Sequence, residues 1–482
     1  MVGFQFQDIA GYHQQLLAGT TTCAAAVEHY LQAISRQPHL NAMVGVFEAE
    51  ARGRAAQLDA ALQAGQALLP LHGVLVSIKD VLCYEGHPVS AASHMLKGYQ
   101  AVYSATAVER LIKAGAIIIG STNCDEFAMG STNEHSAFGP VRNAADTERV
   151  PGGSSGGAAV AVQAGLCMAS LGSDTGGSVR QPADYCGVTG LKPGYGRISR
   201  WGLIAYASSF DCVGILANSV ADVALIYNQL AGPDGKDSTA DTTTPPQVDL
   251  QTMDKASAYR LAYLAPTMDT EGLDPEIKTA IEKTLAQLQA KGHKVAAVPF
   301  PLLEYIVPTY YVLTTAEASS NLGRFDGIRY GHQAAGQPDD LTAFYRRNRS
   351  EGFGKEVQRR IMLGSFVLSA GYYDAYFTKA QQVRQLLVDA TAQIFKEFDA
   401  IIMPVSPHVA PRLGEATADP IAMYMADIFT VFANLTGVPA LAVPLYRHSS
   451  GLPFGLQVLT NRGEEVLLHQ LGAYLEDHFA RR

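Results

Sequence analysis

Hydrophobic and polar positions alternate along the chain in helical and strand-like patterns. Residues 24–67 are rich in alanine and place apolar residues at helical spacing, which predicts helix. The stretch LHGVLVSIKD is typical of a short buried strand that ends at a polar turn with Lys79 and Asp80. A helix from Thr106 to Ala114 then leads through a glycine into the strand AIIIG. This order predicts a strand–helix–strand organisation.

The same rhythm continues to the end of the chain. Gly156 to Gly165 predicts a helix of small residues that can only pack closely, and the strand LCMASLGSD follows it. A polar segment rich in turn formers, 231–256, predicts an exposed connection. The later predicted elements are strand YRLAYLAP, a helix from Asp274 to Lys291, strand HKVAAVPF, a loop-like region over 324–355, a long helix from Tyr372 to Phe398, strand DAIIMP, a helix from Ala422 to Asn434, and strands ALAVPL and FGLQVL.

Length and composition fit one folded α/β protein. The 482 residues could hold about three average domains, but alternation up to the last residues favours a single α/β body. The chain is 48% hydrophobic and 17% charged, which is ordinary for a globular protein. Its net charge of −9 argues against a broad basic surface for nucleic acid.

Cysteine, histidine and apolar runs indicate the compartment. The six cysteines form no CxxC pair, which favours buried free thiols in a reducing environment. The histidines show no zinc-binding spacing, so we expect no metal site. The first residues lack the pattern of a signal peptide, and no apolar run approaches the roughly 20 residues that cross a bilayer. We therefore expect a soluble, cytoplasmic protein.

The stretch from Pro151 to Pro193 holds two turns rich in glycine and serine but contains no histidine. A serine hydroxyl becomes a good nucleophile only when a base removes its proton. The first turn, GGSSGG, is compatible with a flexible turn or with a turn that presents one serine to a site. It also matches the G-x-S-x-G nucleophile elbow, although the preceding RNAADTERVP is polar and not a buried strand.

The second turn, GSDTGGS, follows an apolar strand. Gly176 and Gly177 allow consecutive N–H groups to converge beside Ser178, as an oxyanion hole requires. Converging N–H groups also bind phosphate, but no G-x-x-x-x-G-K-[ST] motif is present. The chemistry favours acyl transfer over phosphate binding, and a purely structural turn remains open.

Lys79 is the candidate base. A lysine at the end of an apolar strand usually extends to the surface. In a buried site its pKa would fall from about 10.4, and the neutral amine could accept a proton directly or through a hydroxyl. The residues alone do not show that Lys79 lies near the two turns.

The motifs VSIKD, PGGSSGG and GSDTGGSVRQPA resemble those of the amidase signature family in order and spacing. The resemblance implies amide hydrolysis by a Ser–cis-Ser–Lys triad, with Ser178 as nucleophile, Ser154 on a cis peptide as bridging serine and Lys79 as general base. It also implies an oxyanion hole formed by the backbone N–H groups of Thr175, Gly176 and Gly177. For the fold it implies a single domain with a central mixed β-sheet covered by helices on both faces. Its parts would be a helical segment over about 1–67, a signature core over about 68–230, the connection 231–256 and a substrate-pocket half over about 257–482.

Further segments resemble one branch of this family, the A subunits of bacterial-type glutamyl/aspartyl-tRNA amidotransferases. These segments include TNCDEFAMGSTNEHSAFGPVRN, RRIMLGSFVLSAGYYDAYFTKAQQVR and DPIAMYMADIFTVFANLTGVPAL. The resemblance implies a glutaminase without a cofactor of its own that works with the B and C subunits of the complex. The B subunit would hold ATP and Mg²⁺ and would use the released ammonia to amidate misacylated tRNA. A second candidate function is a stand-alone amidase for small or aryl amides, and a third is a non-catalytic scaffold protein of the complex.

A glutamine pocket needs an acid for the α-ammonium group and an arginine for the α-carboxylate. The resemblance assigns these roles to Asp427 and Arg360, with Tyr311 contacting the substrate. The neighbouring Tyr310 and Arg359 leave each register open by one residue. From the residues alone, the arginines also fit a solvated helix face and Asp427 a surface acid. Phe432 stands where the resemblance leads us to expect a small residue or proline.

Overall fold

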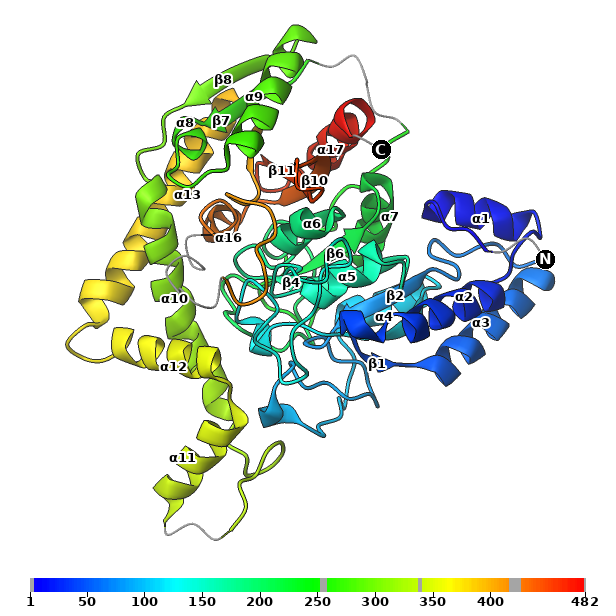
Figure 1. The fold of residues 1–482 in the computed structure, drawn as a ribbon, viewed down its shortest axis with the longest axis horizontal. Coiled ribbons are helices and arrows are strands. Elements are labelled where there is room, and N and C mark those ends of the chain that lie inside the picture. Colours follow the sequence, from blue (N-terminus) through cyan, green and yellow to red (C-terminus); the bar gives the residue numbers. More distant parts are fainter. Residues whose placement is uncertain (1–3, 252–257, 337–339, 416–425, 481–482) are drawn as a thin grey trace.

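A mixed β-sheet runs through the computed structural model, which describes residues 4–251, 258–336, 340–415 and 426–480 (Figure 1). Within these residues the sheet has 11 strands in the order β1-β3-β2-β4-β6-β5-β10-β11-β9-β7-β8. The strands are β1 Met43–Val46, β2 Leu75–Lys79, β3 Ile117–Thr122, β4 Ala169–Asp174, β5 Thr189–Lys192, β6 Cys212–Ala217, β7 Arg260–Leu264, β8 Lys294–Val298, β9 Ala400–Pro404, β10 Ala440–Arg447 and β11 Pro453–Thr460.

Parallel pairing places the ends of three early strands at one edge of the sheet. β2 lies between β3 and β4 and is parallel to both, with Ile78 opposite Ser121 and Leu171. Each of these strands is buried along its whole length, as the apolar sequence predicts. The later strands join the same sheet through the antiparallel pairing of β10 with β5. The residues that follow β2, β3 and β4 therefore emerge close together.

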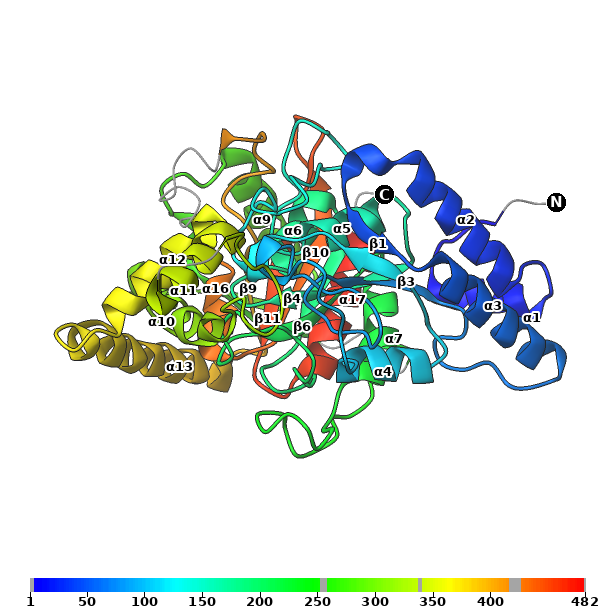
Figure 2. The same ribbon diagram turned by 90° about the horizontal axis from the view of Figure 1, so that it is seen from below.

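Helices cover both faces of the sheet. α5 and α7, for example, lie on opposite sides of β4 and β6 (Figure 2). α1–α3 gather at one end of the molecule and α10–α13 at the other (Figures 1 and 2). The helices are α1 Ile9–Leu17, α2 Cys23–Arg36, α3 Glu48–Gln63, α4 Thr106–Lys113, α5 Gly156–Gln163, α6 Arg180–Cys186, α7 Val220–Leu230, α8 Ala265–Met268, α9 Pro275–Ala290, α10 Ile306–Asn321, α11 Leu341–Gly352, α12 Lys355–Val367, α13 Lys379–Glu397, α16 Val431–Thr436 and α17 Glu465–Phe479.

The predicted α/β fold with a mixed sheet is confirmed. Each strand that the sequence predicts is present, and so are the helices predicted near 106–114, 156–165 and 274–291. The long helix predicted from Tyr372 forms a π-helical turn over Asp374–Thr378 before α13 begins. None of the described helices is both long and apolar enough to cross a membrane.

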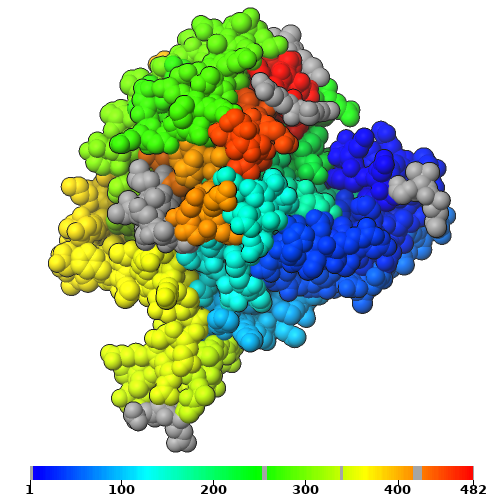
Figure 3. Space-filling view, in the orientation of Figure 1, coloured from blue at the N-terminus to red at the C-terminus, as the bar shows by residue number. Residues whose placement is uncertain are grey.

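The loop-like region predicted over 324–355 is wrong in part, because it contains α11. Asp340 caps this helix by accepting a hydrogen bond from the N–H of Ala343 at 2.7 Å. α11 buries only Asn348 and Gly352 and projects from the rest of the molecule (Figures 1 and 3). A helix with so little buried surface has no apolar stripe, which is why periodicity does not reveal it.

Two other predicted boundaries change. The helical region 24–67 is interrupted by β1, a four-residue strand that is too short to break the alanine-rich pattern. The helix predicted from Ala422 to Asn434 is wrong at its start, because α16 begins at Val431 and residues 426–430 form turns. Residues 422–425 lie outside the described part of the chain.

In the connection 231–256, Val248 is buried and is held by the side chain of Asn228.

The close packing predicted for α5 can be tested at Gly157. A Cβ atom added there would lie 2.4 Å from the carbonyl oxygen of Asn123, whereas one added at the helical Gly53 in α3 would meet nothing within 4 Å. We expect Gly157→Ala to destabilise the protein by roughly 1–3 kcal/mol or more and Gly53→Ala to stabilise it by roughly 0.5–1 kcal/mol. Thermal unfolding midpoints of the two variants measure this difference. Equal shifts in the same direction would contradict the packing argument.

Candidate active site

Lys79 and Ser154 meet at the carboxyl edge of β2. The Lys79 amine donates to Ser154 Oγ at 2.7 Å and to Ser173 Oγ at 2.9 Å, and none of the three side chains is more than 2% exposed. Ser173 lies on β4, the parallel neighbour of β2, so strand pairing carries it to the lysine. The structure therefore brings together a lysine and a serine 75 residues apart.

Burial changes the proton affinity of this lysine. It lowers the pKa of Lys79 from 10.5 to about 8, while the carboxyl groups of Asp125 and Asp174 act in the opposite direction. Because its pKa is about 8, roughly a tenth of the amine is neutral at pH 7. The same 2.7 Å contact allows the neutral amine to accept a proton from Ser154. The surface position that is usual for a strand-end lysine is therefore excluded.

The turn that carries Ser154 is built around Asp125. The Gly153–Ser154 peptide bond is cis, as the resemblance implies. The N–H of Asp125 donates to the carbonyl of Ser154 at 3.1 Å, and a Cβ atom on Gly153 would lie 2.1 Å from Asp125 Oδ2. Only glycine fits at position 153. No strand precedes the turn over the described residues 149–155, so the nucleophile-elbow interpretation fails.

The second turn carries Ser178, which is 8% exposed and thus the most accessible residue of the expected triad. The N–H of Ser155 donates to the carbonyl of Ser178 at 3.1 Å, which joins the two turns. Within the described residues, however, Ser178 Oγ makes no hydrogen bond, and none links it to Ser154 Oγ. Proton transfer from Ser178 to Ser154 therefore stays a prediction.

The expected oxyanion donors differ at one position. The N–H of Gly177 donates to Asp174 Oδ1 at 2.9 Å, so it is not available to a substrate in this conformation. In the part of the chain that the structure describes, the N–H groups of Thr175, Gly176 and Ser178 donate to no protein acceptor. The candidate donors are therefore Thr175, Gly176 and Ser178, because Asp174 takes the N–H of Gly177.

The three pocket residues also come together. Tyr311 donates to Asp427 Oδ2 at 2.8 Å, and the Arg360 guanidinium lies over the Tyr311 ring, 5.4 Å from its centre. Arg360 is 3% exposed and Asp427 is 9% exposed, so neither lies on a solvated face. Burial raises the pKa of Asp427 to about 7, although its hydrogen bond with Tyr311 acts to lower it.

The structure places the two residues of each open register differently. The side chain of Arg359 is 43% exposed, which leaves Arg360 as the inward arginine. Tyr310 and Tyr311 both reach the site, but in different places. A Cβ atom on Gly176 would lie 2.4 Å from Tyr310 Oη, so Tyr310 packs on the nucleophile loop (residues 174–178) while Tyr311 contacts Asp427.

Sequence reasoning missed four residues of the site, namely Asp125, Ser173, Tyr206 and Glu356. Arg360 donates to Glu356 Oε1 at 2.9 Å and to Tyr206 Oη at 2.8 Å. Glu356 stands four residues before Arg360 on α12, a spacing that predicts an ion pair. Ser173 falls within the GSDTGGS motif itself. Tyr206 and Asp125 carry no comparable local signal.

A hollow of about 360 Å³ adjoins the Gly153–Ser154 turn. Its lining includes Thr132, Gln181 and Ala426, the residue before Asp427. Gln181 accepts a hydrogen bond from the N–H of Gly153 at 3.1 Å, which places the hollow beside the turn. The buried hydroxyl of Thr132 has no hydrogen-bond partner among the described residues. The hollow is within the range of small-molecule sites.

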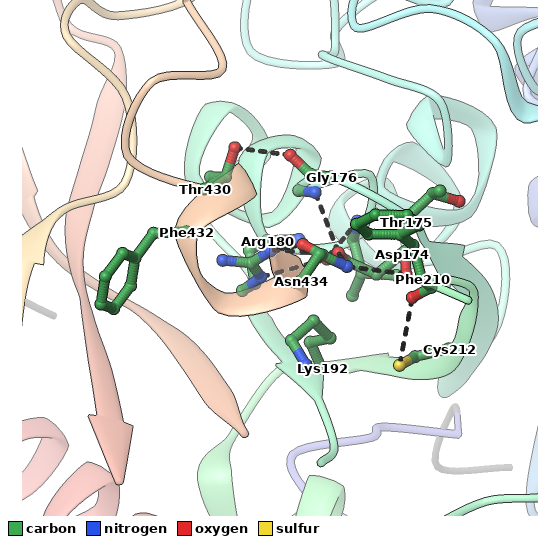
Figure 4. A network of polar contacts seen from close by, with 12 residues as sticks. Asp174, Thr175, Gly176, Arg180, Lys192, Phe210, Cys212, Thr430, Phe432 and Asn434 are labelled. Carbon is green, nitrogen blue, oxygen red and sulfur yellow. Dashed lines mark hydrogen bonds and ion pairs between the residues drawn. The ribbon is translucent and has the colours of Figure 1, made fainter. Parts of the chain in front are cut away.

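Phe432 does not reach this site. It is fully buried and packs edge-on against Phe300, with ring centres 5.5 Å apart. Its ring points away from the polar network around Asp174 (Figure 4).

Comparison with known proteins agrees with this geometry. The Amidase family model matches residues 25–468. The chain belongs to the amidase family. It is 48% identical to the A subunit of a glutamyl-tRNA(Gln) amidotransferase from Acidobacterium capsulatum, over 98% of this chain and 99% of that relative.

Solved structures of this family share the fold. The crystal structure of the A subunit of a glutamyl-tRNA(Gln) amidotransferase from Thermotoga maritima is 38% identical, with a TM-score of 0.79 over 95% of this chain and 92% of that one. A crystal structure described as an amidase is 30% identical, with a TM-score of 0.83 over 98% of this chain and 100% of that one.

The pKa of the buried Lys79 amine predicts how the reactivity of Ser178 depends on pH. Only neutral Lys79 can accept a proton, so labelling of Ser178 by phenylmethylsulfonyl fluoride should rise about tenfold per pH unit and level off near pH 8. Mass spectrometry of the labelled chain measures the rate between pH 6 and 10. Lys79→Met should give slow labelling without this inflection, whereas Asp427→Asn should keep it. A rate that does not change with pH in the unmodified chain would exclude Lys79 as the base.

Proposed function

We propose that this chain is the glutaminase component of a tRNA-dependent amidotransferase. The observation that carries the proposal is the pairing of two features in one buried site. A lysine–serine contact suited to acyl transfer lies beside an acid, a tyrosine and an arginine that suit a free amino acid. The names of the relatives at 48% and 38% identity support the same activity.

The proposed reaction is a two-step acyl transfer. Ser178 Oγ bonds to the side-chain amide carbon of glutamine, and its proton passes through the Ser154 hydroxyl to Lys79. The N–H groups of the nucleophile loop stabilise the oxyanion. The carbon–nitrogen bond then breaks as the same relay returns the proton to the leaving nitrogen, which gives ammonia. Water attacks the acyl-enzyme and releases glutamate, while its proton restores Ser178.

Charge complementarity selects glutamine in this proposal. Arg360 would grip the α-carboxylate, and Asp427 would hold the α-ammonium group with Tyr311 beside it. The bound ammonium group would favour ionised Asp427, whose pKa burial otherwise raises to about 7.

The ammonia would be used by a partner protein of the complex. We propose the B and C subunits of the amidotransferase as partners and the cytoplasm as the location. ATP and Mg²⁺ would bind to the B subunit, whereas this chain would need no cofactor. Misacylated tRNA would be held by the complex rather than by this chain, whose net charge is −9. The products would be Gln-tRNA(Gln), Asn-tRNA(Asn) or both.

The second candidate function, a stand-alone amidase for small or aryl amides, has support from the 30% identical amidase structure. An uncharged amide, however, needs neither Arg360 nor Asp427. Arg360 is paired with Glu356, but a buried Asp427 without a cationic partner would cost stability. The contact between Lys79 and Ser154 argues against a non-catalytic scaffold.

Replacing the nucleophile should separate the two half-reactions. In the complex that co-purifies with the chain, Ser178→Ala should abolish glutamine-dependent amidation of Glu-tRNA(Gln). Amidation with added ammonium chloride should remain, because ammonia then needs no glutaminase. Radiolabelled aminoacyl-tRNA reports both rates. Persistent glutamine-dependent activity would exclude Ser178 as the nucleophile, and the loss of both activities would contradict the division of labour within the complex.

The neighbouring arginines provide a matched test of the substrate. Arg360→Gln and Asp427→Asn should each raise the KM for glutamine roughly 30-fold or more, because each removes one partner of a buried charge pair. Arg359→Lys is the control and should leave KM unchanged, since the side chain of Arg359 is 43% exposed and lysine keeps a positive charge beside its partner Glu356. Steady-state glutaminase assays measure these values. An unchanged KM in Arg360→Gln, with retained turnover of simple amides, would favour the stand-alone amidase.

A further inference from the structure

Residues 427–434 hold the nucleophile loop from the far end of the chain. Thr430 Oγ1 donates to the carbonyl of Gly176 at 2.8 Å, and Asn434 Nδ2 donates to the carbonyl of Asp174 at 3.1 Å. These contacts span 254 and 260 residues of sequence, and Figure 4 shows Thr430 reaching the loop at Gly176 and Asn434 reaching it at Asp174. The segment that carries Asp427 is therefore tied directly to the loop that carries Ser178.

The contact at Gly176 fixes one peptide group at both ends. Its carbonyl accepts the hydrogen bond from Thr430, and the N–H of the same peptide group, which belongs to Gly177, donates to Asp174 Oδ1 at 2.9 Å. With this peptide group held, the N–H groups on either side, those of Gly176 and Ser178, keep their directions. These two N–H groups are candidate oxyanion donors.

Thr430 also contacts Asp427. The Thr430 hydroxyl lies 3.2 Å from the carbonyl oxygen of Asp427, and the Thr430 N–H donates to the same oxygen at 3.1 Å. On the other side, a Cβ atom added to Gly177 would lie 2.2 Å from Thr430 Oγ1, so the backbone of Gly177 packs directly against the Thr430 side chain. One buried side chain thus joins the carbonyl groups of Asp427 and Gly176.

Buried polar contacts around Asp174 support the loop from below. Arg180 is fully buried, pairs with Asp174 at 3.0 Å and donates to Asn434 Oδ1 at 2.7 Å. Burial acts to raise the pKa of Asp174, but Arg180 and the other partners hold that pKa at about 2. Asp174 is therefore ionised across the working pH range and keeps its grip on the N–H of Gly177.

We propose that Thr430 is a positioning residue that couples the α-ammonium subsite at Asp427 to the oxyanion donors of the nucleophile loop. The inference rests on the proposed glutaminase function. When the ammonium group of glutamine engages Asp427, Thr430 holds the loop at the distance from Asp427 that aligns the amide carbon with Ser178. Substrate recognition and transition-state stabilisation are then linked through one hydroxyl group.

The test compares hydroxyl removal at two threonines of this segment. Thr430→Val and Thr430→Ala both remove the hydroxyl, whereas Thr430→Ser keeps it. Thr436→Val is the matched control, because Thr436 Oγ1 donates only to the carbonyl of Phe432 within α16. In the co-purified complex, kcat for glutamine should fall roughly 10- to 100-fold in Thr430→Val and Thr430→Ala, since misplaced reacting groups cost about that much. Thr430→Ser should restore most of the activity, and Thr436→Val should match the unmodified protein.

A double-mutant cycle separates coupling from mere stability. Asp427→Asn removes the charge that would hold the ammonium group, and Thr430→Val removes the contact through which the position of Asp427 would reach the nucleophile loop. The two changes should therefore be non-additive in kcat/KM for glutamine. Additive effects, or activity of Thr430→Val equal to that of Thr436→Val, would overturn the proposal. Unfolding midpoints of all variants are measured in parallel, and a loss that Thr430→Ser fails to restore would mark a purely structural role. If the unmodified complex does not hydrolyse glutamine, the proposed function itself is wrong. If it does hydrolyse glutamine but the Thr430 effects are absent, only the coupling proposal is wrong.

Discussion

The site depends on one buried contact, that of the Lys79 amine with the hydroxyl groups of Ser154 and Ser173. A fully buried ammonium group is costly, so the protein lowers the pKa of Lys79 and provides polar partners on two sides. A base thus arises without histidine. Ser173 lies on β4, the neighbour of β2 in the sheet, and Ser154 lies on the turn beside them. The contact therefore depends on the pairing of β2 with β4.

The two halves of the chain divide the work. The early half supplies the nucleophile loop, the turn with the cis peptide and the lysine, all anchored on buried strands. The later half supplies Tyr311 and Arg360 on helices at one end of the molecule, and Asp427 on the turns before α16. The contacts of Thr430 and Asn434 hold the two halves in register.

Much of this could be predicted from the sequence, and the failures have physical causes. β2 and β4 lie in largely apolar runs, VLVSI and LCMASLG, that end in polar turns, so pattern alone finds them. α11 escapes because its stability comes from its cap and local contacts rather than from an apolar stripe. The position of Lys79 beside Ser173 follows from the pairing of β2 with β4, and that of Ser154 follows from the contact of its turn with Asp125. No local pattern encodes either. The resemblance to a family was needed to connect them.

The Gly177 N–H shows a second limit of prediction from the sequence. Glycines in GSDTGGS predict that several N–H groups converge, but not which of them Asp174 will take. Asp174 must satisfy Arg180 as well as the loop, and that requirement fixes one peptide group and leaves its neighbours pointing elsewhere. Only the three-dimensional arrangement of the carboxylate decides this.

The pKa values of Lys79 and Asp427 both lie near neutral pH. In the proposed reaction, Lys79 must lose its proton to act as a base, and Asp427 must lose its proton to hold an ammonium group. Burial places their pKa values at about 8 and about 7, so both transitions lie near neutral pH. A rise in pH therefore improves binding before it improves proton transfer. In the proposed reaction, a bound ammonium group would favour ionised Asp427, so glutamine would lower the pKa of this carboxyl group below its value of about 7 in the empty pocket.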